Sequence, residues 1–348
     1  MPSKEQLLAD TGRILPILKD GKFVNLFPPR INYWEAATAR FGNKAITEPP
    51  QYLPIDSVDI TKAFPENQDG LYVTWLGHSS LLVQIDGVRI LIDPVFSNSV
   101  SPISWIYEVR RFQQNPPISV KELPFIDAVF ISHDHYDHLD KKSILELASK
   151  VNYFLTPLKV GEHLRDWGID STKIREYAWW QEDVIQGLTG KSLHFACTPT
   201  RHFSGRLLFI GGDKTLWASW TFWSDKHRVF YSGDTSYDVH FRQIGYHYGP
   251  FDLTIIENGQ YSIYWPDSHI MPEDAVKAHI ELRGKKMLPV HWGSFKLSIH
   301  DWWEPIERAS SEALRQGVNL LTPRVGQILQ IDDNPTTSAW WQDFLPKK

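Results

Sequence analysis

Sulfur is scarce in this sequence: its 348 residues include one cysteine, Cys197, and three methionines. A single cysteine cannot form an internal disulfide, which favours a reducing compartment. Long apolar runs are also missing. No segment approaches the 18 residues of a membrane span, and the first residues lack the apolar stretch of a secretory signal. We therefore expect a cytoplasmic protein that is at most peripheral to a membrane.

Basic clusters are missing as well. The 36 Lys and Arg residues are outnumbered by 41 Asp and Glu residues, the net charge is −5, and Lys and Arg form no run. Since nucleic-acid binders usually carry a basic surface, no nucleic acid is expected as a partner. The H-x-K-x-x-x-x-D motif of histidine nucleophiles, the G-x-S-x-G elbow and the P-loop are absent too. These absences argue against a histidine nucleophile, a serine nucleophile on an elbow and a P-loop nucleotide site.

Tryptophan, in contrast, is abundant. There are 15 Trp residues, and aromatic residues make up 13% of the chain. Rings with one apolar and one polar end suit a core, an aromatic-lined pocket or the headgroup layer of a membrane. Composition alone leaves core packing and membrane contact as alternatives.

The chain divides into two parts by pattern. Residues 1–65 are rich in Pro and Asn and predict an N-terminal arm, with one short helix near 34–41, packed on a main domain of residues 66–348. The arm could contact a membrane, cap the fold or build a homodimer interface. The main domain opens with three β-rich runs, which predict an antiparallel meander. These runs cover residues 71–77, 79–86 and 88–94.

The rest of the main domain alternates strands and helices. Two βα halves, with mixed sheets packed face to face and helices outside, would account for this α/β pattern. Ligands would then bind where the strands end and the sheets meet. Further strands are expected at 126–132, 152–157, 192–199, 215–222, 228–233, 252–258 and 285–291, and helices near 141–150, 158–168, 236–247, 272–283 and 304–316.

The stretch "VFISHDHYDHLD" at 129–140 places metal-capable side chains directly behind an apolar strand. Three more, His202, Asp234 and His291, also follow apolar strands, so loops at one sheet edge can bring all of them together. Imidazole and carboxylate groups are good ligands for zinc and its neighbours. The set suits two metals roughly 3.5–4 Å apart with room for a shared hydroxide. The predicted ligands are His133, His135 and His202 for one metal, Asp137, His138 and His291 for the other, and Asp234 between them.

Most other histidines carry no such pattern. We assign packing or surface roles to His163, His194, His227, His240, His247, His279 and His300.

These ligands, together with longer phrases, carry a family resemblance. The H-x-H-x-D-H signature at 133–138, followed by His202, Asp234 and His291, resembles that of the metallo-β-lactamase superfamily. Within it, the chain is most similar to the N-acylphosphatidylethanolamine-hydrolysing phospholipase D family. The supporting phrases are "GKFVN", "ELPFIDAVFISHDHYDHLD", "WWQE", "LWASWTF", "SGDTSY", "IGYHYGPFDL", "SHIMPEDAVKAH" and "HWGSF". The phrases "TRHFSGR" and "NGQYSIYWPD" depart from that family, which leaves the acyl and alkyl groups of the substrate open.

The resemblance implies a four-layer αβ/βα sandwich, the metallo-β-lactamase fold. It implies a hydrolase with two zinc ions per chain, with iron or manganese as alternatives at one site. Its substrate would be an N-acylphosphatidylethanolamine-like lipid, cleaved to phosphatidic acid and N-acylethanolamine, with peripheral membrane contact. Asp137 would orient or deprotonate the attacking water, and Asp234 would set the metal spacing.

Two other functions remain open at this stage. A sugar-phosphate lactonase could use the same ligands to attack a carbonyl carbon, and Arg or Lys near the metals would favour it. A metal-stabilised lipid-binding module without catalysis would be expected to have lost ligands.

His269 is the one histidine outside the ligand set for which we predict a catalytic role. It precedes a helix whose start is marked by Pro272, Glu273 and Asp274, and it lies between the strands of Asp234 and His291. A histidine there could donate to a phosphoryl oxygen or protonate the leaving alkoxide. The alternative is that His269 caps or packs against the helix start.

Overall fold

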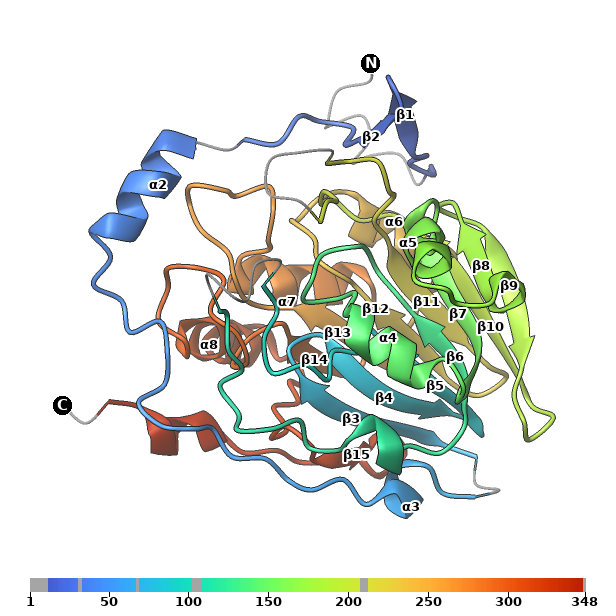
Figure 1. The fold of residues 1–348 in the computed structure, drawn as a ribbon. Helices are drawn as coiled ribbons and strands as arrows, with labels where there is room; N and C mark the ends of the chain where they lie inside the picture. Colours follow the sequence, from blue (N-terminus) through green and yellow to red (C-terminus); the bar gives the residue numbers. More distant parts are fainter. Residues whose placement is uncertain (1–11, 31–32, 67–68, 102–107, 207–211, 347–348) are drawn as a thin grey trace.

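Two mixed β-sheets packed face to face form the centre of the computed structural model (Figure 1). The structure describes residues 12–30, 33–66, 69–101, 108–206 and 212–346. Helices cover the outer faces of both sheets, so the predicted α/β four-layer sandwich is confirmed.

The first sheet has the strand order β15-β3-β4-β5-β6-β7-β8. Strands β3, β4 and β5 form the predicted antiparallel meander, and β5 to β8 run parallel. The bounds are β3 (Leu71–Gly77), β4 (Ser80–Ile85), β5 (Val88–Ile92), β6 (Ile126–Phe130), β7 (Val151–Pro157), β8 (Ile174–Tyr177) and β15 (Ile328–Gln330).

The second sheet has the order β14-β13-β12-β11-β10-β9. Its first three strands in this order run parallel, and the rest pair antiparallel. The bounds are β9 (Glu182–Gln186), β10 (Ser192–Thr198), β11 (Ser219–Trp223), β12 (Arg228–Tyr231), β13 (Leu253–Glu257) and β14 (Met287–Val290).

Successive side chains along a strand point to opposite faces of the sheet, so each strand contributes to apolar packing on both faces. In β4, Val83 and Ile85 belong to the core between the two sheets, whereas Leu82 faces the helices outside. Large rings fill the space between the sheets, and Trp75, Trp217 and Trp220 are among the largest fully buried side chains. Much of the tryptophan content therefore serves core packing.

The helices start and stop where local signals place them. The Asp140 side chain accepts a hydrogen bond from the backbone of Lys142 at the start of α4, and Gly317 ends α8 in the left-handed conformation. The bounds are α4 (Lys141–Leu147), α5 (Val160–Asp166), α6 (His240–Tyr248), α7 (Pro272–Glu281) and α8 (Glu304–Gln316), with short 3₁₀ turns η1 (Val120–Glu122), η2 (Ser171–Lys173), η3 (Ile331–Asp333) and η4 (Trp340–Phe344).

The N-terminal arm contains the hairpin β1 (Ile17–Lys19) and β2 (Lys22–Val24), the predicted helix as α2 (Tyr33–Phe41), and α3 (Ile60–Ala63). It begins at the top of Figure 1 with β1 and β2, passes α2 at the left and reaches α3 at the bottom. Arg30 bonds the Asp267 carboxylate through its backbone N–H and its guanidinium, and Asn25 donates to the carbonyl of His202 at 2.7 Å. The arm thus lies against loops that carry predicted site residues, while a domain boundary at 65/66 stays a prediction.

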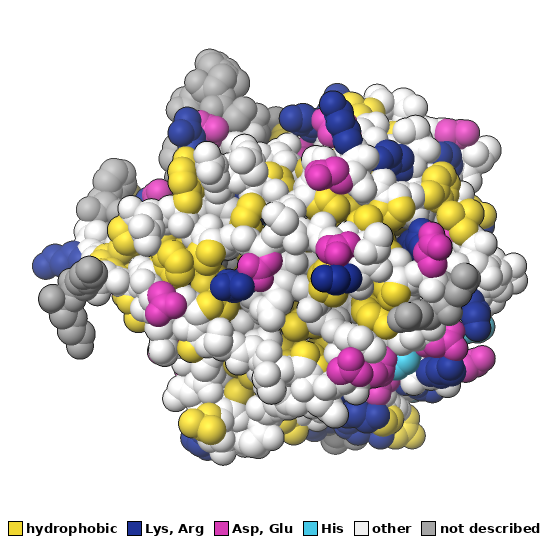
Figure 2. Space-filling model, turned by 90° about the horizontal axis from the view of Figure 1, so that it is seen from below, with side chains coloured by type: hydrophobic (Ala, Val, Ile, Leu, Met, Phe, Trp, Pro, Cys, Tyr) yellow, Lys and Arg dark blue, Asp and Glu magenta, His cyan; other side chains and the backbone are white. Residues whose placement is uncertain are grey.

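Acidic and basic side chains are interspersed with apolar ones on the face seen from below in Figure 2. Across the described ranges, none of the helices combines the length and the apolar character that a membrane span requires.

Candidate metal centre

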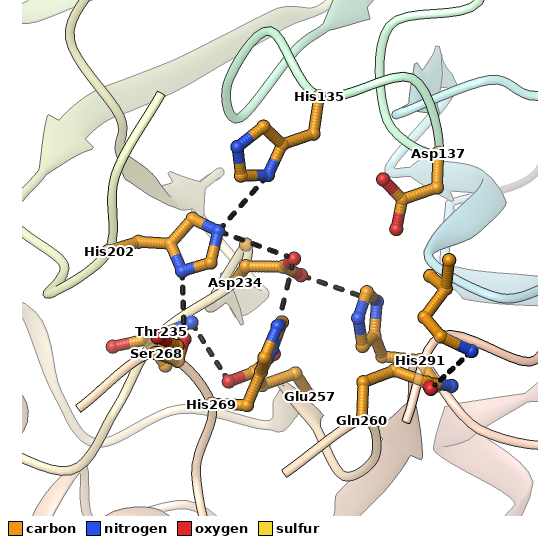
Figure 3. Close-up of polar contacts among 12 residues, drawn as sticks. His135, Asp137, His202, Asp234, Thr235, Glu257, Gln260, Ser268, His269 and His291 are labelled. Atoms are coloured by element: carbon orange, nitrogen blue, oxygen red, sulfur yellow. Dashed lines mark hydrogen bonds and ion pairs between the residues drawn. The ribbon is translucent and has the colours of Figure 1, made fainter. Parts of the chain in front are cut away.

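All seven predicted ligands lie in loops that leave the ends of strands at one edge of the sandwich. Figure 3 labels His135, Asp137, His202, Asp234 and His291 among them. The H-x-H-x-D-H segment follows β6 in the first sheet. The other three ligands follow strands of the second sheet: His202 follows β10, Asp234 follows β12, and His291 follows β14. Carboxyl ends of parallel strands meet at the same edge, which is why residues so distant in sequence converge.

The first group of side chains contains His133, His135 and His202, with Asp234. Nδ1 of His135 lies 2.8 Å from Nε2 of His133 and 3.2 Å from Nε2 of His202. Three ring nitrogens therefore face one small volume, as the ligands of a single cation would.

The second group contains Asp137, His138 and His291, together with His78. All four side chains offer an atom within 4.8 Å of one another. Three are the predicted ligands of the second metal, and His78 was not expected from the sequence.

Asp234 lies between the two groups (Figure 3). Its Oδ2 is 3.7 Å from Nε2 of both His133 and His202. Its Oδ1 is 3.0 Å from Nε2 of His138 and 3.3 Å from Nδ1 of His291. One carboxylate oxygen faces each group, which is the arrangement that a bridging ligand needs.

The outer nitrogens of these rings are held by fixed partners. Nδ1 of His138 lies 2.7 Å from Oδ2 of the fully buried Asp93, and Nδ1 of His202 donates to the carbonyl of Ser268 at 2.8 Å. Such partners fix the ring orientation and leave Nε2 for a metal.

Burial sets the charge of most of the imidazoles. It lowers the pKa of His133, His202 and His291 well below the usual histidine value. It also lowers the pKa of His135 to about 4. These rings are neutral at pH 7, and neutral imidazole is the form that binds a metal ion.

The carboxylates give the centre its negative charge. Burial opposes a charge on His138, but the carboxylates of Asp234 and Asp137 raise its pKa well above the usual value. Burial in turn raises the pKa of Asp234 to about 7, although His138 lowers it. Two buried acids thus draw positive charge to the point where a cation would sit.

Buried atoms without hydrogen bonds show that metal ions fit. Among the described residues, Nε2 of His138, Nε2 of His291 and Oδ1 of Asp234 are buried without a hydrogen bond of good geometry. Such atoms are costly unless something binds them. Divalent cations are suitable partners for this donor set of imidazole nitrogens and carboxylate oxygens.

Close backbone contacts hold the ligand loops in place. Gly233 precedes Asp234 with φ +58°, and a Cβ there would lie 2.7 Å from the carbonyl oxygen of Ala218. His291 itself has φ +69°, a conformation that costs free energy in a non-glycine residue. A Cβ on Gly259 would lie 2.3 Å from the carbonyl oxygen of His291. Only glycine permits this approach.

His78 and Asp93 are site residues that the sequence reasoning missed. Nε2 of His78 lies 2.7 Å from Oδ2 of Asp137, and its ring is 4.0 Å from that of His291. Both residues directly follow apolar strands, β3 and β5. Applying the same strand-exit criterion to every strand would have found them.

His269 lies at the edge of the centre, next to Asp234 and His291. Its Nδ1 is 2.9 Å from Oε2 of Glu257 and 4.0 Å from Oδ2 of Asp234. The structure thus places it beside the ligand groups, while its role stays a prediction. None of the seven histidines assigned to packing or surface roles joins these groups in the part of the chain that the structure describes.

The surroundings of the centre combine an aromatic side chain with arginines that are already engaged. The Phe203 ring packs against His202 and His135 and is 40% exposed. Arg201 pairs with Asp267 at 3.1 Å. Arg206 donates to the backbone carbonyls of Asp134 and Leu139 and lies over the Tyr136 ring.

Comparison with known proteins agrees with this geometry. A family profile described as "Beta-lactamase superfamily domain" matches residues 88–292. The chain is 40% identical over 341 residues to the uncharacterized protein Rv0906 of Mycobacterium tuberculosis, covering 94% of this chain and 87% of that protein. It is 31% identical over 296 residues to N-acyl-phosphatidylethanolamine-hydrolyzing phospholipase D 1 of Caenorhabditis elegans, covering 81% of each chain.

Solved structures share the fold. Igni18, a metallo hydrolase from Ignicoccus hospitalis, aligns with a TM-score of 0.53 and 20% identity over 74% of this chain and 97% of that chain. An isothiocyanate hydrolase from Delia radicum gut bacteria aligns with a TM-score of 0.54 and 21% identity over 74% of this chain and 98% of that chain. At these identities the likeness concerns the fold.

Proposed function

Because the chain belongs to the metallo-β-lactamase superfamily of metal-dependent hydrolases, we propose that it is a binuclear zinc phosphodiesterase acting on phospholipids. The preferred substrate would be N-acylphosphatidylethanolamine or a close analogue, as the name of the nematode relative suggests. The observation that carries the proposal is the placement of Asp234, with one carboxylate oxygen toward each group of histidines.

When bound at these groups, two metal ions would supply an activated water and would neutralise charge on the phosphoryl oxygens. One metal would be held by His133, His135 and His202, and the other by Asp137, His138 and His291. Asp234 would be a ligand of both. Zinc is proposed because histidine and carboxylate ligands suit it, with iron or manganese as alternatives at one position.

The side chains of the centre then divide the work of hydrolysis. The water oxygen forms a bond to phosphorus in line with the leaving group, and the bond from phosphorus to the oxygen of N-acylethanolamine breaks. Asp137, whose Oδ2 is held by His78, orients the water and accepts its proton. His269 protonates the departing alkoxide. The products are phosphatidic acid and N-acylethanolamine.

The environment of the centre favours a lipid over a sugar phosphate. Phe203 presents an aromatic ring beside His135, and the nearby Arg201 and Arg206 are bonded within the protein. A lactonase that binds a sugar phosphate would need cationic side chains directed at the substrate.

A panel of substrates tests the proposal. N-acylphosphatidylethanolamine, a soluble aryl phosphodiester, a nucleic acid and several lactones are compared side by side, with metal content measured by elemental analysis. We expect about two zinc ions per chain and turnover of the phosphodiesters, with the lipid preferred. Cys197→Ala should behave like wild type, because this buried thiol lies in β10 within the core. Turnover of lactones alone would contradict the proposed phosphodiesterase activity. Protein that contains no metal and stays inactive after reconstitution with metal would contradict the proposal that the protein is a metal-dependent enzyme.

Membrane contact through the arm is the second part of the proposal. Leu15, Leu18 and Trp34 on the arm are 63%, 58% and 78% exposed. Apolar side chains on such a surface suit the interface of a bilayer. Co-sedimentation with vesicles should decrease when residues 1–30 are deleted. Unchanged co-sedimentation would exclude residues 1–30 as the membrane contact, and a change in oligomeric state instead would identify them as part of a dimer interface.

A further inference from the structure

Glu257 is a fully buried carboxylate at the end of β13 that belongs to none of the ligand positions predicted from the sequence. Its Oε1 accepts hydrogen bonds from the backbone N–H groups of Thr235 at 2.9 Å and Ile270 at 3.0 Å. Its Oε2 lies 2.9 Å from Nδ1 of His269. The Thr235 contact is drawn in Figure 3.

These contacts connect two loops of the centre to one rigid strand. Thr235 directly follows Asp234, and Ile270 directly follows His269, so a single oxygen fixes the backbone beside both residues. The neighbouring Glu257 backbone N–H is itself bonded to the hydroxyl of Ser232. Burial raises the pKa of Glu257 well above its usual value, so an acidic side chain with no exposure is costly in the core of a sheet unless its polar atoms are bonded.

The remaining oxygen determines how the His269 ring lies. Because Oε1 is already occupied by two donors, Oε2 is the atom that meets the ring, and it meets Nδ1. The ring also packs against those of His202 and His291, with centroids 5.2 Å and 5.3 Å away. Held by its Nδ1 on one side and by two rings on the others, His269 is left with Nε2 for an external group.

We propose that Glu257 is a positioning residue that fixes the His269 ring through Nδ1, so that Nε2 is presented to the leaving oxygen of the substrate. The inference rests on the proposed function, in which His269 protonates the departing alkoxide. Glu257 itself touches neither substrate nor the reacting atoms. Fixing a general acid in this way acts on kcat, because the benefit arises only when the proton is transferred.

Kinetics of Glu257→Ala and Glu257→Gln, each alone and combined with His269→Ala, test the proposal. His269→Ala should lower kcat roughly a hundredfold. Glu257→Ala should lower kcat at least about tenfold with little change in KM and two metals retained, and it should add nothing in the His269→Ala background. Glu257→Gln keeps an oxygen for the two backbone donors and an amide group for Nδ1 of His269. Compared with Glu257→Ala, it should therefore restore most of the fixed orientation of the His269 ring and part of kcat.

Asp127→Asn is the matched control. Asp127 is a buried carboxylate that accepts from the backbone N–H groups of Arg89 and Leu188 at 2.8 Å each. It lies at the opposite end of β6 from the metal ligands. Loss of such backbone bonds alone should lower stability in this variant without changing kcat.

Two results would overturn the positioning role. One is the same fold-loss of kcat from Glu257→Ala with and without His269, which would show a general structural effect. The other is loss of a metal ion from Glu257→Gln, which would make Glu257 a ligand. The crystal structure of zinc-loaded Glu257→Ala is a readout that does not depend on turnover: we expect a rotated or disordered His269 ring, and an unmoved ring contradicts the proposal. Failure of the wild type on every substrate would instead count against the proposed function.

Discussion

His78 is a side chain that supports a predicted metal ligand, Asp137. Its ring is completely buried between Phe295 and His291, and its Nε2 meets Asp137 at 2.7 Å. Burial lowers its pKa to about 4, although Asp137 raises it, so the ring is neutral and one of its nitrogens carries a proton. A side chain that forms a hydrogen bond to a metal ligand orients that ligand and raises the affinity of the site for the metal.

We predict that His78→Asn weakens metal binding by roughly ten- to a hundredfold, the range usual for lost partners of metal ligands. Asparagine tolerates the positive φ of 53° at this position, so the backbone should be maintained. Competition with a chromophoric chelator measures the affinity. His279→Asn, which removes a buried histidine bonded to Thr254 in the second sheet, is the control. Equal affinity in both variants and the wild type would reduce His78 to a packing residue.

At the residue scale, local spacing explains what the sequence could predict. The H-x-H-x-D-H pattern is dense enough to be recognised alone, and His202, Asp234 and His291 could be added because each follows an apolar strand. Glu257 could not be predicted this way, because it is the last residue of its strand and its three partners come from loops distant in sequence. Its burial and bonds exist only in the folded sheet.

Among the structural elements, the arm contacts the loops of the site through Arg30 and Asn25. Arg30 holds Asp267 through a bidentate pair, and Asp267 also binds Arg201. The neighbouring Ser268 carbonyl accepts from His202, so the arm helps to fix the loop that orients a predicted ligand. The Arg30 side chain is 77% exposed, whereas that of Asp267 is 2% exposed.

We predict that Arg30→Met lowers stability by only about 0.2–1 kcal/mol, because an exposed arginine gains little from an ion pair. Its effect on kcat/KM should be about two- to fivefold, corresponding to roughly 0.4–1 kcal/mol. Arg110→Met, which removes another exposed arginine paired with a carboxylate, should change stability little and activity not at all. Thermal unfolding and steady-state kinetics distinguish the two variants. An equal loss of activity in both would show that the arm has no specific influence.

At the end of the sandwich opposite the metal centre, His227 connects the two sheets through two carboxylates. This residue precedes β12 in the second sheet, and its two ring nitrogens each lie 2.8 Å from a carboxylate, Asp86 of the β4–β5 turn and Asp332 after β15. Burial opposes the charge, but these two carboxylates raise the pKa of His227 above its usual value. Lys226 and Asp69 form a neighbouring ion pair, so the region contains charges of both signs.

The pH dependence of stability follows from this direction. Because the folded-state pKa of His227 is raised, its contribution is complete below the unfolded value of about 6.5 and is lost as pH rises through the folded value. We predict that His227→Gln lowers the free energy of unfolding by about 1–2 kcal/mol at pH 6 and by less at pH 9. Urea unfolding at the two pH values measures this difference. A loss of unfolding free energy that does not depend on pH would contradict an ionic interaction of protonated His227 with Asp86 and Asp332.

Long, apolar elements were predictable and short edge elements were not. The strands from 71 to 92 and the helix at 304–316 have periodic patterns that burial dictates. Strands β8, β9 and β15 lie at or near sheet edges, and β9 is largely exposed. They form strands because of the strands they pair with, so their own residues carry no periodic pattern from which they could be predicted.

For the molecule as a whole, the predicted metals act as a bond between the two sheets. One set of ligands leaves β6 in the first sheet, and the rest leave three strands of the second. Ions bound only by the folded protein stabilise it by mass action, about 4 kcal/mol at a thousandfold excess over Kd. For a chain of 348 residues that corresponds to a shift in Tm of about 5 °C.

We predict that a chelator lowers the Tm of the purified protein by about that amount and that added zinc restores it. Differential scanning calorimetry measures both transitions. Asp234→Asn, which removes one charge from the carboxylate between the groups, should have a reduced response to chelator and zinc. A Tm that chelator leaves unchanged, in protein shown to contain metal, would mean that the ions do not link the sheets.

The division of the ligands between sheets also has a consequence for biosynthesis. Residues 133–138 leave the ribosome well before residue 291, by roughly 10–30 s at ordinary elongation rates. During that interval a nascent chain displays the three histidines and two neighbouring aspartates of its first half without their partners. Any ion captured then would be held by an incomplete set and exchanged easily. Under the proposed ligand assignment, the complete set is therefore available only after β14 has emerged, and final metal selection would follow that moment.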